Sequence, residues 1–561
     1  MAYGGGSFAQ AASMSKTAII YGLEARLALK AGVDVVANVV KCTMGPGGRS
    51  VAYKPPLGPV RITHDGVSAA GGIRLGNGFV QVGADIAIEA CRLTNTTAGD
   101  GTTTAAVLTQ AITDAAHRMV AAGVDPMRLR YGIAAAVGRV DQLLREQTKS
   151  VQTFERIVEV AGLSADDMEI GEIVANIFRR HGPGAAISVI ASHRMDVEVH
   201  TIDGMRVARG LASPHLSTDN MRIRAELDSC DVLVTDRDLD CVDQLLPFLE
   251  AYVASGGERL LVVAKTIGGD VLPTLVENHA RRRVSTIAVR APAFGKRQRE
   301  VLEDIAIFTG ATLVAHEAGQ GWPSVPLGVL GKAARVRSDA RETIIVNGGG
   351  EPQAITHRSE ILWHEHARAK NQFDREKLEE RIRNLSGAIS EVQVGASTEV
   401  ERVELQHRVE DAIAATRAAL DDGVVAGGGS ALARAAREIA PPPGTHPDEA
   451  AGWTAVATSM TVPLARIAHN AGFDGAVSVY EVMRRSEPHV LDVRSGDYVD
   501  PMVVGLVDPA RAVRAALRYA ASAAVMIITA NTVISDASSY REWARDICPR
   551  LVREAGVLLA E

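Results

Sequence analysis

Residues 98–104 read Ala-Gly-Asp-Gly-Thr-Thr-Thr, and an unbroken apolar run from Ala105 to Ala122 follows them directly. The run has the length of a helix, so the loop leads straight into the start of that helix. Glycines let the backbone approach a ligand closely, and a helix start presents unpaired N–H groups at the positive end of the helix dipole. With three hydroxyls added, the stretch favours a site for phosphate oxygens. The alternative, that Thr102, Thr103 and Thr104 only cap the helix, has similar weight from this stretch alone.

Asp100 does not suit a phosphate directly, because both groups are negative. A carboxylate at this place is useful if Mg²⁺ lies between it and the phosphates, since Mg²⁺ is usually held by one or two carboxylates together with phosphate oxygens. The sequence contains no G-x-x-x-x-G-K-S/T motif, which excludes a P-loop NTPase.

Two more glycine-rich stretches resemble loops that contact a ligand. Residues 43–49 read TMGPGGR, and residues 423–429 read GVVAGGG before a predicted helix over Ser430–Ile439. Each alone is more often a simple turn. Three such loops far apart in one chain are harder to explain as turns only.

The secondary-structure patterns change twice along the chain. The first part is helical, with an amphipathic helix predicted over Tyr21–Lys41 and a β-hairpin over 50–63. Between about Met205 and Ile345, short β-rich runs alternate with helical patterns such as Val242–Ala254, which predicts an α/β domain with partly parallel strands. The last third is helical again. This order predicts an α/β domain inserted into a helical one.

The β-rich runs that carry this interpretation are Asp231–Thr235, Arg259–Ala264, Val284–Val289 and Ala311–Val314. No G-x-G-x-x-G follows a strand there, so a metabolic α/β enzyme that uses this sheet is a poor alternative.

Two carboxylates are candidates for catalysis. Asp65 follows a strand in a sharp turn, and Asp411 lies among apolar neighbours in a long helix predicted over Glu399–Leu420. A carboxylate beside a metal-bound triphosphate can orient and deprotonate an attacking water. From spacing alone, a helix cap or a surface charge is the more frequent role for each.

Composition narrows the class of protein. The 561 residues are 47% hydrophobic and 23% charged, as in ordinary globular proteins, and the net charge of −7 argues against nucleic acid as a partner. Five widely spaced cysteines without a C-x-x-C pair, and an N-terminus without a secretory pattern, lead us to expect a cytoplasmic protein. The most apolar segment, Ala520–Ile534, is interrupted by polar residues and is predicted to be a buried helix rather than a membrane span.

Several of these blocks, in this order, resemble the group I chaperonins of the GroEL type over about residues 14–537. The resemblance rests on the stretches 43–49, Thr63–Gly66, Ala98–Thr104, Val394–Val400, Val409–Ala412, Ala415–Ala419, Gly423–Gly429 and Val507–Pro509.

The resemblance implies a multidomain α and α/β fold with three domains. These are a mostly helical equatorial domain (1–146 and 422–561), a small intermediate hinge domain (147–203 and 390–421) and an inserted α/β apical domain (204–389).

It also implies an ATP site with Mg²⁺ and, as a candidate second cation, K⁺. Asp100 would bind Mg²⁺, Gly101 to Thr104 would hold the phosphates, and Asp65 and Asp411 would act on the attacking water. The remaining nucleotide contacts would come from Thr43, Met44, Gly45, Pro46, His64, Gly428, Asp492 and Asp508. The sequence around Asp492 departs from the sequence that is common in the family. His64 stands where the family commonly has a lysine.

In the apical domain, the resemblance implies an apolar groove that binds non-native polypeptides and then a GroES-type co-chaperonin lid. The matching positions are Leu211, His215, Leu216, Leu246, Leu249, Leu272, Val276 and Glu277. For Leu246 and Leu272, burial in an ordinary helix core is the alternative. His215, Leu216 and Glu277 depart from the family's usual residues, which affects substrate preference and lid binding.

Arg209 and Glu399 match positions that form an inter-subunit salt bridge in the family. We therefore expect a divergent paralogue that forms a homo-oligomeric ring, with about seven subunits in a single or double ring, and an ATPase coupled to protein folding. The competing hypothesis is an oligomeric protein-binding scaffold with slow or no ATP turnover.

Overall fold

The computed structural model describes residues 17–54, 60–192, 194–218, 223–315, 325–369, 371–385, 388–485, 488–536 and 543–547. The chain divides into two compact units, one built from residues 1–151 and 422–561 and the other from residues 152–421. It therefore leaves the first unit, builds the second and returns, as the order of the sequence patterns predicts. The finer division of the second unit into an intermediate and an apical domain stays a prediction.

The first unit is mostly helical. Its elements are β1 (Thr17–Tyr21), α1 (Gly22–Val40), η1 (Lys41–Thr43), β2 (Val51–Tyr53), β3 (Arg61–Thr63), α2 (Gly66–Gly71), α3 (Gly78–Ala98), α4 (Thr102–Ala121), α5 (Pro126–Gln147), β12 (Val424–Ala426), α14 (Ser430–Glu438), α15 (Pro447–Ser459), α16 (Val462–Asn470), α17 (Gly475–Arg484), β13 (Val490–Leu491), β14 (Tyr498–Val499), α18 (Pro501–Val504), β15 (Val507–Pro509), α19 (Ala510–Thr529), β16 (Thr532–Asp536) and η6 (Trp543–Ile547).

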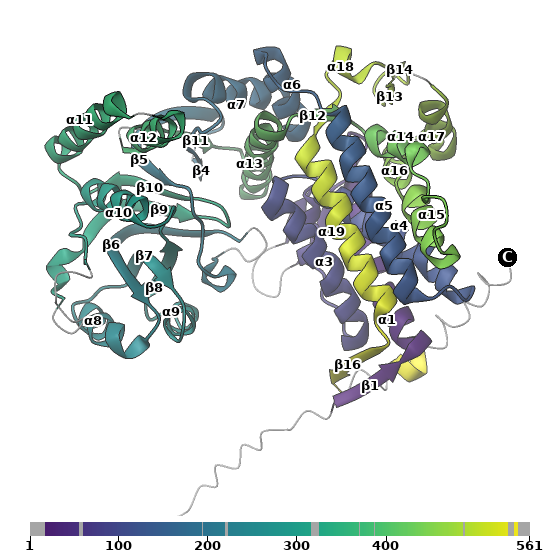
Figure 1. Ribbon diagram of the computed structural model, residues 1–561, viewed down its shortest axis with the longest axis horizontal. Helices are drawn as coiled ribbons and strands as arrows, with labels where there is room; N and C mark the ends of the chain where they lie inside the picture. Colours follow the sequence, from purple (N-terminus) through teal and green to yellow (C-terminus); the bar gives the residue numbers. More distant parts are fainter. Residues whose placement is uncertain are drawn as a thin grey trace, which may run out of the picture. The chain divides into compact units, whose positions relative to one another are not determined.

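Helix α19, yellow in Figure 1, lies along α3, α4 and α5 and joins the two ends of the chain in one core. Leu108 and Ile112 of α4, Ile133 of α5 and Leu517 of α19 are all buried in this core. Glycines allow the closest helix approach: a Cβ on Gly83 of α3 would lie 2.0 Å from the backbone oxygen of Leu29 in α1. Helices α1 and α3 therefore lie in close contact at this glycine.

The prediction of one buried helix over Ala520–Ile534 is wrong in its last third. Helix α19 ends at Thr529, and β16 begins at Thr532 and pairs antiparallel with β1. The β-branched run Thr532–Ile534 favours a strand, and the partner strand from the other end of the chain supplies the hydrogen bonds. By length and composition alone, α19 could cross a membrane, but in this unit it is a core helix with a buried alanine and isoleucine face.

The predicted hairpin is confirmed as β2 paired antiparallel with β3. Its predicted turn at 55–59 lies outside the described residues.

The second unit is an α/β structure. Its elements are α6 (Phe154–Ala165), α7 (Met168–His181), β4 (Ile187–Ala191), β5 (Val197–Val207), η2 (Pro214–Leu216), β6 (Ala225–Leu239), α8 (Val242–Ala254), β7 (Arg259–Ile267), α9 (Val271–Ala280), β8 (Ser285–Arg290), α10 (Lys296–Thr309), η5 (Leu327–Val329), β9 (Gly331–Ser338), β10 (Thr343–Gly348), α11 (Pro352–Arg368), α12 (Gln372–Leu385), β11 (Ala388–Val394) and α13 (Glu399–Asp422).

One eight-stranded sheet runs through this unit in the order β4-β11-β5-β10-β9-β6-β7-β8. Strands β6, β7 and β8 are parallel, which confirms the prediction of partly parallel strands. Alternate residues of β7 enter two different cores, Leu261 and Val263 on one face and Leu260 and Val262 on the other. Such burial of both faces is typical of parallel strands.

The predicted strand Ala311–Val314 is not formed. Only Val314 makes an isolated bridge, to Thr235. The short apolar run packs beside β6 without the further partner residues that a full strand requires.

Candidate functional site

The Ala98–Thr104 stretch forms a tight connection between α3 and α4. Gly99 ends α3 and Gly101 caps α4, and both have positive φ angles of 75° and 85°. A Cβ on Gly101 would lie 3.1 Å from the backbone oxygen of Ala512, at the start of α19. Because Gly101 has no side chain to cap α4, the first turn of this helix offers its N–H groups to an anion.

The turn that carries Asp65 packs against this helix start. Asp65 caps α2, where its carboxylate accepts hydrogen bonds from the N–H groups of Val67 and Ser68, both at 3.1 Å. A Cβ on the next residue, Gly66, would lie 2.6 Å from Oγ1 of Thr103 and 3.0 Å from Oγ1 of Thr102. The structure therefore brings the candidate carboxylate and the threonine hydroxyls together.

Strand pairing brings Asp508 to the glycine-rich loop at residues 423–429. Strand β15 pairs with β12, which places Asp508 opposite Val425, just before Gly427. The N–H groups of Gly428 and Gly429 lie near the Asp508 carboxylate and favour its ionised form. Both glycines have positive φ, 61° and 75°, a backbone shape that lets the loop wrap around this carboxylate.

The carboxylates at the site are close enough to affect one another. Burial raises the pKa of Asp100. The N–H group of Gly101 lowers this pKa, and the negative charge of Asp65 raises it again. Burial, followed by the charge of Asp100, raises the pKa of Asp508 to about 7, although the Gly428 and Gly429 N–H groups oppose the rise. Asp65, Asp100 and Asp508 thus form one acidic cluster contributed by both ends of the chain.

This donor set fits Mg²⁺ bound together with a nucleotide. A divalent cation would relieve the repulsion within the acidic cluster, and hard oxygen ligands are what Mg²⁺ prefers. Within the described ranges, no three His, Cys, Asp or Glu side chains are arranged to hold a metal by themselves. The remaining ligands would therefore have to come from phosphate oxygens and water.

The loop of Thr43, Met44, Gly45 and Pro46 includes the end of η1, which contacts α4. Oγ1 of Thr43 donates to the backbone oxygen of Val40 at 2.9 Å. The side-chain amide of Asn470 donates to the backbone oxygens of Lys41 and Met44, both at 2.9 Å. Sequence analysis missed Asn470, because no spacing links the end of α16 to this loop.

His64 directly precedes Asp65, and Asp492 directly follows strand β13. His64 is exposed, and its Nε2 lies 2.8 Å from Oγ of Ser50. Asp492 lies in the turn after β13, where its carboxylate accepts the N–H of Arg494 at 2.9 Å. Val490 in β13 packs over Gly428, where an added Cβ would meet Val490 Cγ2 at 2.9 Å. The strand that leads to Asp492 therefore covers the glycine loop.

Asp411 belongs to the other unit. It is half-buried on α13, next to Val409, Ala412 and Ile413, which pack in a core with α6 and α7. The long helix that sequence analysis predicted there is confirmed. The role of Asp411 in hydrolysis stays a prediction.

The predicted polypeptide groove involves α8, α9 and the segment around η2. Leu246 is 38% exposed and His215 is exposed, while Leu211, Leu272 and Val276 are half-buried. Leu216 and Leu249 are buried in the core beneath the helices. Glu277 is exposed and pairs with Arg281 at 2.5 Å, which partly neutralises its charge.

The predicted inter-subunit residues are both exposed on the second unit. The Glu399 carboxylate binds Arg402 of its own helix at 2.5 Å. The backbone oxygen of Arg209 accepts a hydrogen bond from Oγ1 of Thr343 at 2.7 Å.

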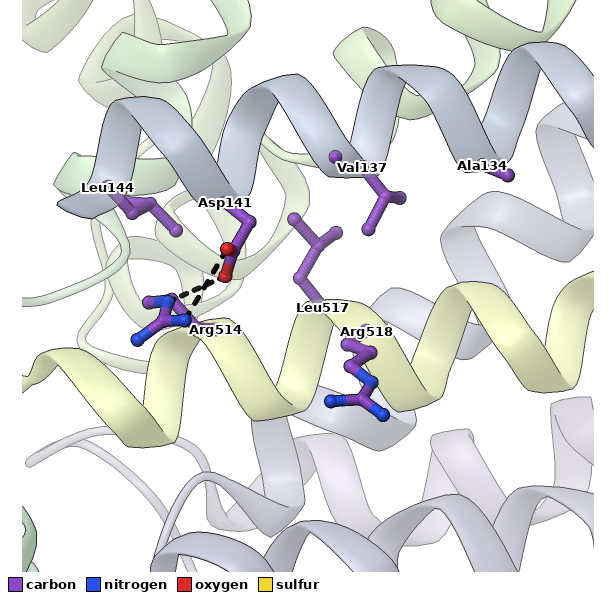
Figure 2. A pocket seen from close by; sticks show the side chains of 8 residues that line it. Ala134, Val137, Asp141, Leu144, Arg514, Leu517 and Arg518 are labelled. Carbon is purple, nitrogen blue, oxygen red and sulfur yellow. Dashed lines mark hydrogen bonds and ion pairs between the residues drawn. The ribbon is translucent and has the colours of Figure 1, made fainter. Parts of the chain in front are cut away.

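A hollow of about 260 Å³ lies between α5 and α19 (Figure 2). Its walls include Val137 and Leu517 together with Asp141, whose carboxylate binds Arg514 at 2.6 Å. It contains none of the predicted site residues.

Comparisons with known proteins bear on this geometry. The sequence model of the TCP-1/cpn60 chaperonin family matches residues 36–538. Among solved structures, the chain is similar to the chaperonin gp146 from the bacteriophage EL 2 (Pseudomonas aeruginosa), crystallised in the presence of ATP-BeFx. Crystal form II of that protein aligns with a TM-score of 0.64 at 21% identity, over 92% of this chain and 98% of that chain. Crystal form I aligns with a TM-score of 0.58 at 20% identity, over 92% and 99%.

Proposed function

The chain belongs to the TCP-1/cpn60 chaperonin family, and on this premise we propose that it is an ATP-hydrolysing chaperonin. Its subunits would form a homo-oligomeric ring, of about seven members in one or two layers, in the cytoplasm. The ring would bind non-native polypeptides and promote their folding through ATP-driven movement. The chaperonin-type folding role follows from the family, and the ATP chemistry is the proposal that the site supports.

The observation that supports it best is the approach of Asp508 to Asp100. These residues come from opposite ends of the chain, yet the charge of Asp100 raises the pKa of Asp508. Around them lie an uncapped helix start and a glycine loop with left-handed backbone. A magnesium-bound triphosphate supplies the charge that such a cluster lacks, and the helix start supplies N–H donors to its phosphates.

In this proposal each residue has a separate task. Asp100 would bind Mg²⁺, and Gly101, Thr102, Thr103 and Thr104 would hold the phosphates. The nucleoside would lie toward Gly428 and Asp508, with Asp492 beyond, and the Thr43–Pro46 loop would close the pocket with His64 at its rim. K⁺ would be a second cation at the phosphates.

Asp65 and Asp411 would orient the attacking water and accept its proton for in-line displacement. Because Asp411 lies on α13 of the other unit, hydrolysis would depend on the placement of that helix. Cleavage would then be coupled to the conformation of the inserted unit.

The inserted unit would bind clients along α8 and α9. Exposed apolar atoms of Leu246, with half-buried Leu272 and Val276 beside them, would leave water when an unfolded segment binds, at about 25 cal/mol per Å² buried. A GroES-type lid would compete for the same surface. The Glu277–Arg281 ion pair makes this surface more polar, and it is the observation that favours the alternative of a scaffold with a narrow client range.

Steady-state phosphate release tests the ATPase. Wild type should release phosphate from ATP, and Asp411→Ala should lose most of this activity while it still binds nucleotide. Glu401→Ala, an exposed change on the same helix, should keep the activity. Equal phosphate release by wild type and Asp411→Ala would refute the mechanism, and no turnover by wild type would favour the scaffold.

A further inference from the structure

Helix α13 is attached to the sheet of its own unit by two clusters of buried charges. Glu410 anchors one cluster and Arg417 the other, and they lie about two turns apart on the helix. Residues at this spacing share one helix face. That face of α13 is therefore fixed to the sheet at two points.

In the first cluster, one carboxylate oxygen of Glu410 binds two arginines. Arg337 of β9 donates to it at 3.1 Å, and Arg224, just before β6, also pairs with it. Arg337 donates in addition to the backbone oxygen of Val189 in β4 at 3.1 Å. The Glu410 side chain is only 10% exposed and that of Arg337 13%, so solvent screens this contact weakly.

In the second cluster, Glu342 binds two arginines. Arg206 of β5 lies 2.5 Å from its carboxylate, and Arg417 of α13 lies 2.9 Å away. Arg417 also donates to the backbone oxygen of Ala185 at 2.9 Å. The Glu342 side chain is 8% exposed.

Each carboxylate separates two guanidinium groups that would otherwise repel each other. Loss of the Glu410 charge would leave Arg224 and Arg337 close together and partly buried, with less negative charge to balance their mutual repulsion. Removal of one partner from a buried ionic group is strongly destabilising, whereas an intact group adds little to stability over an apolar core. The best-attested use of such groups is to fix one arrangement of packed elements, and here that arrangement is the setting of α13 on the sheet.

The consequence for Asp411 follows from helix geometry. Successive residues point about 100° apart around a helix, so a fixed direction for Glu410 also fixes the direction of Asp411. A rotation of α13 that releases Glu410 would turn Asp411 by the same angle.

We propose that Glu410, with Arg224 and Arg337, positions Asp411 by fixing the rotation of α13 against the sheet. The inference rests on the proposed function, in which Asp411 acts on the attacking water. Glu410 is not proposed to touch substrate. It is a positioning residue, and Arg417 with Glu342 supports the same helix two turns further along.

The test compares Glu410→Gln with Glu404→Gln in the full-length chain. Glu404 is on the same helix, and its described ion pair is with Arg408 of that helix, at 3.9 Å. In nucleotide-free protein, hydrogen–deuterium exchange of the α13 amides should rise in Glu410→Gln and stay at the wild-type level in Glu404→Gln. In single-turnover experiments, Glu410→Gln should hydrolyse bound ATP roughly ten- to a hundredfold more slowly, with nucleotide affinity unchanged.

Unchanged exchange in Glu410→Gln would overturn the proposal, and so would faster exchange with unchanged hydrolysis. If Glu410→Gln does not fold, Arg224→Gln keeps one guanidinium on Glu410 and should show the same effects in weaker form. If wild-type hydrolysis does not depend on Asp411, the proposed function fails, while the exchange measurement still decides whether Glu410 fixes the helix.

Discussion

Asp508 and Asp100 lie close enough for their charges to interact, although they come from the two ends of the chain. The negative charge of Asp100, added to burial, raises the pKa of Asp508 to about 7. Their proximity depends on β12 and β15, whose pairing carries Asp508 to the glycine loop, and on α19, which packs against α3 and α4. The acidic cluster is thus a product of the tertiary fold of the first unit.

The first prediction concerns the cation. Asp100→Asn removes the charge that would bind Mg²⁺, so magnesium-dependent ATP affinity should fall by roughly ten- to a hundredfold, the value of one charge-assisted interaction. Titration of a fluorescent ATP analogue with and without Mg²⁺ measures this. Asp85→Asn, an exposed change on α3, is the matched control. Equal affinities for Asp100→Asn and the control would contradict the role of Asp100.

The second prediction is a pH dependence. The pKa of Asp508 is raised from 3.8 to about 7, so its protonated form contributes stability that is complete below about pH 4 and is lost as the pH rises through 7. Asp508→Asn mimics the protonated form and keeps an oxygen near the Gly428 and Gly429 N–H groups. At about pH 8 the ligand-free variant should be more stable than wild type by roughly 1 kcal/mol or more.

Thermal unfolding between about pH 5 and pH 8 checks this result. Wild type should lose stability across the range relative to Asp508→Asn. Parallel curves for the two proteins would show that Asp508 does not titrate there.

The third prediction concerns acid stability of the inserted unit. Burial opposes ionisation of Glu342, but Arg417 and Arg206 outweigh it and lower its pKa from 4.5 to about 2. Its contribution to stability is present above about pH 4.5 and is lost as the pH falls toward 2. Glu342→Gln should cost about 3–5 kcal/mol at neutral pH, because it leaves two half-buried arginines without this carboxylate.

Circular dichroism during denaturant unfolding at several pH values measures this difference. Glu360→Gln, which changes an exposed carboxylate on α11, should unfold like wild type. The gap between wild type and Glu342→Gln should narrow below about pH 4, and a gap that stays constant down to pH 2 would contradict the ion-pair explanation.

The fourth prediction compares two helical glycines. Gly83→Ala places a Cβ 2.0 Å from the Leu29 backbone oxygen, so it should destabilise the first unit by about 1–3 kcal/mol or more. Gly138→Ala in α5 meets nothing within 4 Å and should stabilise it by about 0.5–1 kcal/mol through helix propensity. Denaturant unfolding of both variants measures whether each change lowers or raises the free energy of unfolding. Destabilisation of similar size in both would contradict the close α1–α3 contact.

Local sequence patterns were sufficient to predict much of the fold. Helix α8 spans the predicted Val242–Ala254, and the order of helical and α/β segments matches the two units. These features depend on periodicity within one segment. The segment after Thr529 was misassigned, because its strand exists only through pairing with β1, which periodicity does not show.

The candidate site also has parts that a local sequence pattern indicates and parts that only the tertiary fold brings together. The AGDGTTT stretch made a phosphate loop about as favoured as a simple helix cap, whereas the roles of Gly428 and Asp508 came only from resemblance to a family. Their meeting requires β12 to pair with β15 across a long stretch of chain. Asn470 and Arg337 gave no local signal, since their side chains bind residues that are far away along the chain.

We propose that both ends of the chain build one site for magnesium-bound ATP. The decisive experiment is electron microscopy of the purified protein with Mg²⁺ and a non-hydrolysable ATP analogue. We expect a nucleotide with its phosphates at Thr102–Thr104, its cation on Asp100 and its nucleoside toward Gly428 and Asp508. A nucleotide bound elsewhere, or no nucleotide at saturating concentration, would contradict it.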